Sequence, residues 1–172
     1  MSGMRPSLYN KTIHRFIYGK QQWIWYHRGM GKIYLAYGSN MNIGQMKRRC
    51  PAAKLMGTAM LEGWRLMFRR RRRPVATIEQ EKGCCVPVVL WEITDECEKS
   101  LDVYEGFPVL YVKKDVNLVF EGKPVTAMAY VMAAGHELGV PHEDYYNTIL
   151  EGYRDNGLDP GPLDEAVRYS GC

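Results

Sequence analysis

A short strand that stops abruptly is the feature of this sequence that most constrains its fold. Residues Ile33 to Tyr37 form a β-branched and aromatic run, and Gly38-Ser39-Asn40 follows it directly, which predicts a tight turn. Asn42 is a good helix N-cap, and Pro51 ends the helix that we expect to run to about Cys50. The sequence therefore predicts a strand, a tight loop and a helix in succession.

The rest of the chain mixes strands and helices. We expect short strands near residues 54–60, 64–68, 76–79 and 85–93, a hairpin at 111–120 and 125–132, and helices at 95–105, 143–155 and in the tail. Because strands come before and after helices without a regular βαβ alternation, this pattern favours a mixed α+β domain over a doubly wound sheet. At 172 residues and a hydrophobic fraction of 46%, one globular domain is expected.

Residues 1–31 differ from this pattern, because basic residues are interspersed among bulky aromatics and no period of strand or helix is sustained. We expect them to form a peripheral N-terminal extension or leader to a domain spanning residues 32–172. A secretory signal and a membrane-spanning apolar run are both missing from the sequence. The five cysteines, with Cys84 and Cys85 adjacent, do not suggest a disulfide framework. These features favour a cytoplasmic protein with reduced thiols.

The turn at residues 38–40 is a candidate ligand site. A strand that passes through such a turn into a helix leaves backbone amides pointing outward, where a carboxylate or phosphate group can bind. Gly38 permits close approach, while Ser39 and Asn40 add a hydroxyl and an amide. A structural role, with glycine allowing the turn and asparagine capping the helix, explains the same residues. The lysine of a P-loop is missing, so nucleotide phosphate binding is disfavoured.

Glu105, at the end of the helix expected at residues 95–105, is a candidate acid or base. The helix dipole, the nearby Asp102 and the aromatic neighbours Tyr104 and Phe107 should raise the pKa of this glutamate. A carboxyl group with a raised pKa suits proton transfer near neutral pH. Two alternatives stay open: Asp102 is the active carboxylate, or Glu105 is a solvated surface side chain.

Two segments together resemble the γ-glutamylcyclotransferase and AIG2-like family: Tyr37-Gly38-Ser39-Asn40-Met41 and Leu101-Asp102-Val103-Tyr104-Glu105-Gly106. Ala76-Thr77-Ile78 and Leu90 to Thr94 match as well, and the resemblance covers about residues 32–158. It implies a small barrel-like mixed sheet with flanking helices. It also implies a cavity that binds a small γ-glutamyl compound without a metal or an organic cofactor.

The reaction that the resemblance implies is an intramolecular aminolysis, of transferase or lyase type. The α-amino group of the γ-glutamyl unit attacks its own side-chain carbonyl, which forms 5-oxoproline and expels the attached amino acid or amine. Glu105 would take up the proton of the ammonium group and return one to the leaving amine. The loop would hold the substrate in a folded conformation.

Substrate binding is expected at these residues: Tyr37, Gly38, Ser39, Asn40, Met41, Tyr111 and Tyr130. Tyrosine hydroxyls on strands can line a cavity and donate hydrogen bonds, although half-buried packing is an equally common role for them. A relative that keeps the fold, loses catalysis and only binds a small molecule is an alternative function. Metal chemistry has little support, because the sequence has neither HExxH nor Cys-x-x-Cys spacing.

The run Arg69 to Arg73 is not part of the shared pattern. Clustered arginines near Trp64 and Phe68 could bind nucleic acid. We favour a solvated strand end instead, because Glu79 and Glu81 follow closely. Attraction of an acidic γ-glutamyl substrate is a third interpretation of this run.

Overall fold

The computed structural model describes residues 31–172. The expected extension at residues 1–31 lies outside this range, apart from Gly31, and stays a prediction. Within the described range, the helices are too short or too polar to cross a bilayer.

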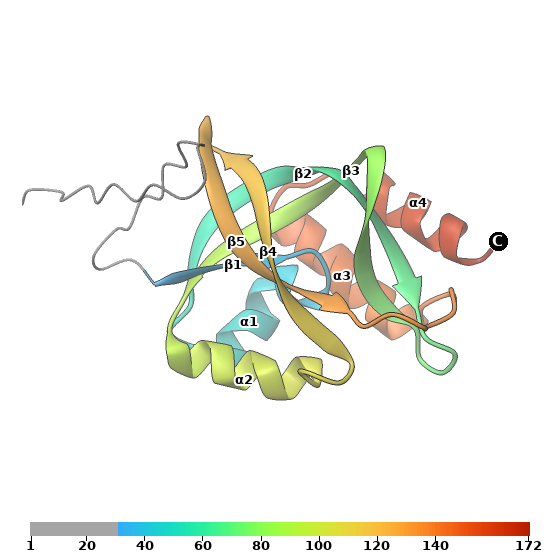
Figure 1. The fold of residues 1–172 in the computed structure, drawn as a ribbon, viewed down its shortest axis with the longest axis horizontal. Helices are drawn as coiled ribbons and strands as arrows, with labels where there is room; N and C mark the ends of the chain where they lie inside the picture. The colour runs from blue at the N-terminus through green and yellow to red at the C-terminus, as the bar shows by residue number, and fades with distance from the viewer. Residues whose placement is uncertain (1–30) are drawn as a thin grey trace, which may run out of the picture. The chain divides into compact units, whose positions relative to one another are not determined.

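The described chain consists of one five-stranded sheet and four α-helices, with a short 3-10 turn between β1 and α1 (Figure 1). The elements are β1 (Lys32–Ala36), η1 (Ser39–Met41), α1 (Ile43–Arg49), β2 (Lys54–Arg69), β3 (Val75–Ile93), α2 (Asp95–Glu105), β4 (Tyr111–Phe120), β5 (Lys123–Met132), α3 (Glu143–Asp155) and α4 (Gly161–Ser170).

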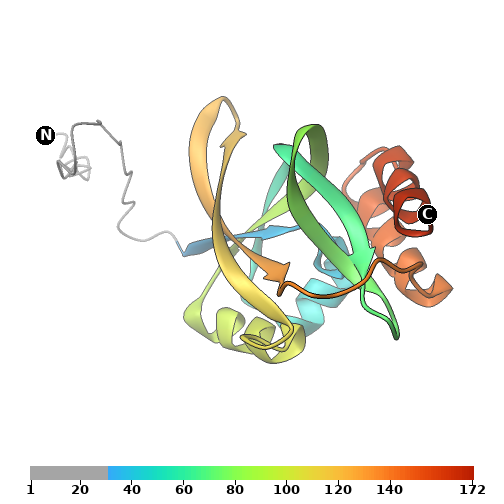
Figure 2. The ribbon, with the colours of Figure 1, turned by 45° about the vertical axis from the view of Figure 1, so that its right-hand side comes forward.

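The strands are ordered β2-β3-β1-β5-β4, with the short β1 at the centre. β1 runs antiparallel to β3, with Leu35 opposite Leu90, and parallel to β5. Figure 2 shows how strongly the two long hairpins, β2–β3 and β4–β5, curve on either side of β1. The sheet edges approach each other, because a Cβ atom added to Gly57 in β2 would lie 3.3 Å from the ring of Phe120 in β4.

No ladder joins β2 to β4 among residues 31–172, so the sheet stays open. The α+β prediction with flanking helices is confirmed, and the expected barrel-like shape corresponds to a curved sheet that is not closed.

The four short strands expected between residues 54 and 93 are instead two long ones. Gly63 has φ 77° and lies at a register shift between Glu62 and Trp64, so the strand bends there without ending. Gly83 has φ 87° and likewise lies inside a continuous strand, β3. Glycines that look like turns in the sequence thus serve as bends within continuous strands.

The helices begin and end close to the predicted positions. The side chain of Thr94 accepts a hydrogen bond from the backbone of Cys97, and Gly106 ends α2 with φ 64°. α3 packs against η1 so closely that a Cβ atom on Gly152 would lie 2.7 Å from the backbone nitrogen of Asn42. Asn156 also donates a hydrogen bond of 2.9 Å to the carbonyl of Met41. α3 therefore fixes the turn that follows β1.

Candidate active site

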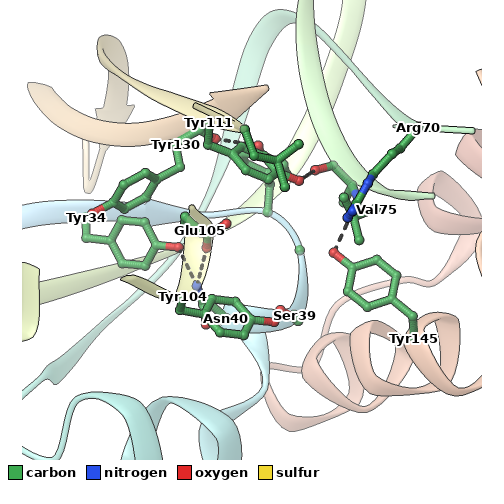
Figure 3. A pocket seen from close by; sticks show the side chains of 14 residues that line it. Tyr34, Ser39, Asn40, Arg70, Val75, Tyr104, Glu105, Tyr111, Tyr130 and Tyr145 are labelled. Atoms are coloured by element: carbon green, nitrogen blue, oxygen red, sulfur yellow. Dashed lines mark hydrogen bonds between the residues drawn. The ribbon is translucent and has the colours of Figure 1, made fainter. Parts of the chain in front are cut away.

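A cavity of about 180 Å³ lies where the end of β1, the η1 turn and the end of α2 meet (Figure 3). It is rich in tyrosine and contains one carboxylate. Its lining residues are Tyr34, Tyr37, Gly38, Ser39, Asn40, Arg70, Val75, Ala76, Tyr104, Glu105, Leu110, Tyr111, Tyr130 and Tyr145.

Asn40 connects the turn to the carboxylate. Its Nδ2 donates hydrogen bonds to Glu105 Oε1 at 2.9 Å and to the Tyr34 hydroxyl at 2.8 Å. Its Oδ1 accepts from the guanidinium of Arg49, and its backbone carbonyl accepts from Trp91 Nε1 at 3.2 Å. Only 3% of the surface of Asn40 is exposed, and both polar atoms of its side chain form hydrogen bonds.

The backbone of the turn faces the same cavity. A Cβ atom on Gly38 would lie 3.2 Å from Cβ of Ala76, so glycine allows the turn to lie close against β3. The N–H groups of Gly38, Ser39 and Asn40 have no acceptor among the hydrogen bonds of residues 31–172. These amides are available to a carboxylate or a carbonyl oxygen in the cavity.

Burial raises the pKa of Glu105 to about 7, while the charge of Arg49 and the hydrogen bond from Asn40 act in the opposite direction. The raised pKa agrees with the sequence expectation, but its main cause is loss of hydration and not repulsion by Asp102. Near neutral pH, both the protonated and the ionised form of a carboxyl group with this pKa are populated.

Asp102, the alternative carboxylate considered above, lies in a different environment from Glu105. It forms an ion pair of 2.7 Å with Lys113 and accepts a hydrogen bond of 2.6 Å from the Tyr130 hydroxyl. Burial acts to raise the pKa of Asp102, but Lys113 and Tyr130 outweigh it and the net pKa is lowered. Asp102 does not line the cavity. It therefore stays ionised and orients Tyr130 from outside.

The buried phenols are neutral hydrogen-bonding groups. Burial is the largest cause of the raised pKa values of Tyr34, Tyr37 and Tyr111. Tyr37 donates to the backbone carbonyl of Tyr130, and Tyr111 donates to that of Ala76. These bonds tie β1, β3, β4 and β5 together around the cavity.

The structure brings together most of the residues that the sequence analysis proposed: Tyr37, Gly38, Ser39, Asn40, Glu105, Tyr111 and Tyr130. Met41 is placed differently, because it is completely buried in the core and does not line the cavity. The 3-10 turn directs Ser39 and Asn40 to the cavity, and α3 covers the backbone of Met41.

Several lining residues were missed, and three of them are polar aromatics. Tyr34 bonds Asn40, Tyr145 accepts from the backbone N–H of Ala76 at 3.2 Å, and the Tyr104 hydroxyl lies 3.0 Å from Ser39 Oγ. The signal for Tyr104 was its position next to Glu105. Tyr145 lies on α3, and no local pattern connects that helix to the turn.

The sequence analysis also missed Arg49, which contacts both Tyr104 and Asn40. Its guanidinium carbon lies 3.4 Å from the centre of the Tyr104 ring, in addition to the hydrogen bond to Asn40. In residues 31–172, no three His, Cys, Asp or Glu side chains are close enough to hold a metal ion.

A carboxyl group with a pKa near neutrality, neutral phenols and free amides around one small cavity are typical of an enzyme site for acid–base chemistry on a small polar molecule. The sequence model of the family "Gamma-glutamyl cyclotransferase, AIG2-like" matches residues 34–147. Human γ-glutamylcyclotransferase is 32% identical over 136 residues, which cover 73% of this chain and 72% of the human protein. The chain belongs to this family and is a γ-glutamylcyclotransferase-like enzyme.

Comparison with solved structures supports the same family assignment. A γ-glutamyl cyclotransferase structure superposes with a TM-score of 0.71 at 29% identity, covering 80% of this chain and 86% of that chain. The structure of an uncharacterized human protein superposes with a TM-score of 0.70 at 30% identity and the same coverage. The YkqA protein of Bacillus subtilis, at 20% identity and a TM-score of 0.68, shares the fold over 81% of this chain and 54% of its own length.

Proposed function

We propose that this protein converts a γ-glutamyl amino acid or γ-glutamyl amine to 5-oxoproline and releases the amino acid or amine. The observation that carries the proposal is the position of Glu105, whose carboxyl group has a pKa of about 7 and is fixed by Asn40 in the lining of the cavity. The γ-glutamylcyclotransferase relatives support the same reaction type.

The proton balance of this reaction suits one carboxylate. The substrate α-ammonium group must lose a proton before its nitrogen can attack the γ-carbonyl carbon. The new carbon–nitrogen bond closes the five-membered ring, the ring nitrogen loses a second proton, the original amide bond breaks, and the leaving nitrogen gains two protons to leave as an ammonium group. Glu105 can carry out these transfers one after another, because it accepts each proton as a base and then donates it as an acid.

The turn supplies the groups that would hold the reacting end of the substrate. The amides of Gly38, Ser39 and Asn40, which have no acceptor within residues 31–172, are donors for the substrate α-carboxylate or for the negative charge that develops on the carbonyl oxygen. Because both reacting groups belong to one molecule, binding it in a folded conformation lowers the barrier to ring closure.

The test is release of 5-oxoproline from a panel of γ-glutamyl amino acids and amines, measured with the parent protein and with Glu105→Gln. We expect the variant to lose about 100-fold or more in kcat, because general acid–base catalysis typically contributes at least that factor. Glu62→Gln, at an exposed position on β2, is the matched control and should keep full activity.

Asp102→Asn separates the two candidate carboxylates. We expect this variant to keep most of its activity, because Asp102 acts through Tyr130. Loss of activity in Asp102→Asn together with full activity in Glu105→Gln would contradict the assignment. A folded parent protein that acts on no member of the panel would favour the alternative of a non-catalytic binding protein.

A further inference from the structure

The arginine run at residues 69–73 contains two different kinds of side chain. Arg69 pairs with Glu79 at 2.6 Å and donates a hydrogen bond of 2.9 Å to the carbonyl of His136, so it fastens the end of β2 to its neighbours. Arg70 is the one member of the run that lines the cavity. All four residues from Arg70 to Arg73 are exposed, but Arg71, Arg72 and Arg73 do not line the cavity.

The backbone of Arg70 is held in a conformation that side-chain-bearing residues rarely adopt. Its φ is 115°, and its N–H donates a hydrogen bond of 2.8 Å to the carbonyl of Glu137. Gly139 packs on the other side, where an added Cβ atom would lie 3.2 Å from the Arg70 carbonyl and 2.7 Å from Pro74. Strained backbone that its surroundings impose is typical of functional positions. The surroundings thus fix the point from which the Arg70 side chain extends.

The Arg70 guanidinium has no counter-ion among residues 31–172. The ion pairs of the described residues engage Arg65 and Arg69 in this region, but none involves Arg70. A guanidinium group matches the planar geometry of a carboxylate better than any other side chain. An unpaired guanidinium facing a cavity is therefore available to a carboxylate of the ligand.

Arg70 and Glu105 lie apart within the cavity. In Figure 3, Arg70 lies beside Val75 and Tyr145, on the opposite side of the cavity from Glu105. The cation that lowers the pKa of Glu105 is Arg49. The reacting end of a γ-glutamyl compound must lie at Glu105 and the turn, so the part that leaves must extend away from them, toward Arg70.

We propose that Arg70 is a specificity-determining residue that binds a carboxylate on the leaving part of the substrate. This inference rests on the proposed function. It makes the enzyme select γ-glutamyl compounds whose released amine carries a carboxylate, and it discriminates against plain γ-glutamyl amines. The reaction that supplies the substrate then joins glutamate, through its side-chain carboxyl group, to the amino group of an amino acid.

The test compares γ-glutamyl-L-alanine with γ-glutamylethylamide, which differ by the carboxylate of the leaving group alone. We expect Arg70→Gln to lower kcat/KM for γ-glutamyl-L-alanine on the order of 10- to 100-fold, because a charge-assisted hydrogen bond is lost. Turnover of γ-glutamylethylamide should change less than about threefold. Arg70→Lys should fall between the parent and Arg70→Gln, since it keeps the charge without the planar fork.

Arg72→Gln is the matched control, because it removes the same charge from the same run at an exposed position outside the cavity. It should leave the preference between the two substrates unchanged. An equal loss on both substrates in Arg70→Gln would overturn the proposal, because Arg70 would then act on the γ-glutamyl unit or on the fold. A parent protein without preference for the carboxylate would overturn it as well.

Calorimetric titration of the same proteins with both compounds separates this proposal from the proposed function. If the parent releases no 5-oxoproline but binds γ-glutamyl-L-alanine more tightly than the ethylamide, and Arg70→Gln abolishes this difference, the reaction fails and the role of Arg70 stands. If the parent forms 5-oxoproline and Arg70→Gln still prefers γ-glutamyl-L-alanine to the ethylamide, the proposed reaction is supported and the proposed role of Arg70 is contradicted. Binding of neither compound by the parent contradicts both.

Discussion

The polar groups at the two ends of the cavity differ in how many partners they have within the protein. At the inner end, Asn40 and Glu105 are tied into a network with Arg49, Tyr34 and the turn. At the arginine end, the backbone of Arg70 is firmly held, but its guanidinium has no acidic partner in residues 31–172. The difference teaches that a group that moves a proton must be fixed before the substrate arrives, whereas a group that recognises charge must be left unpaired for it.

The inner end is also a place where the protein gives up stability. Burial of Glu105 favours its protonated form, so the ionised carboxylate needed for catalysis is destabilised in the folded state. The arginine end carries strain of another kind, in the positive φ of Arg70. The following variants break or sharpen this comparison.

After the loss of Glu105 itself, the largest expected effect comes from breaking the network that holds it. Asn40→Ala removes the donor to Glu105 and leaves the side chain of Arg49 without its acceptor. We expect kcat to fall by about 10- to 100-fold, because the carboxylate is no longer held in position. Steady-state release of 5-oxoproline measures this effect.

Asn117→Ala, at an exposed position on β4 where the side chain contacts Thr126, is the control for Asn40→Ala and should keep full activity. Circular dichroism checks that both variants are folded. A folded Asn40→Ala protein with less than about threefold loss of kcat would show that Glu105 does not depend on this hydrogen bond.

The second prediction concerns the dependence of stability on pH. The pKa of Glu105 is about 7 in the folded protein, against 4.5 for an ordinary glutamate. The folded state therefore binds the proton more tightly than the unfolded state, and its free energy of unfolding falls as pH rises from about 4.5 to 7. Glu105→Gln, which has no proton to lose, should be more stable than the parent at pH 8 by up to about 3 kcal/mol.

Urea unfolding of both proteins at acidic and alkaline pH checks this prediction. At pH 4.5 and below, the difference between parent and variant should become small, because the parent carboxyl group is then protonated in the folded state. A difference that does not change with pH would contradict a raised pKa for Glu105. Glu62→Gln is again the control, and it should follow the parent at each pH.

The smallest expected effect is at the arginine end. Gly139→Ala would place a Cβ atom 2.7 Å from Pro74 and 3.2 Å from the carbonyl of Arg70, so the loop must shift. We expect the preference for γ-glutamyl-L-alanine over γ-glutamylethylamide to fall about three- to tenfold, because Arg70 is displaced from its carboxylate. Competition between the two substrates in one reaction measures this ratio directly.

Gly161→Ala, on α4 and close to the flexible side chain of Asp159, is the control for Gly139→Ala and should leave the preference unchanged. If Gly139→Ala slowed the turnover of both substrates equally, the packing of Gly139 against the Arg70 backbone would stabilise the fold and would not determine substrate selectivity.

Most of the local structure was predictable from the sequence. The cap at Thr94, the end of α2 at Gly106 and the turn after β1 depend on neighbouring residues and appear where they were expected. The two long strands were not predicted as such, because a glycine at a bulge and a glycine at a turn look alike without the partner strand. The family motifs pointed to Glu105 and to the turn for the same reason, since each motif lies within a few consecutive residues.

The sequence by itself determined the positions of the helices, the family and the short segments that line the inner end of the cavity. Only the tertiary structure decided that Asn40 meets Glu105 across 65 positions of the chain, that Asp102 turns away to Lys113, and that Met41 enters the core. It also decided which arginine of a uniform run reaches the cavity. Capping and turn formation depend on bonds between near neighbours, whereas the meeting of distant side chains depends on strand register and helix packing, which no local pattern encodes.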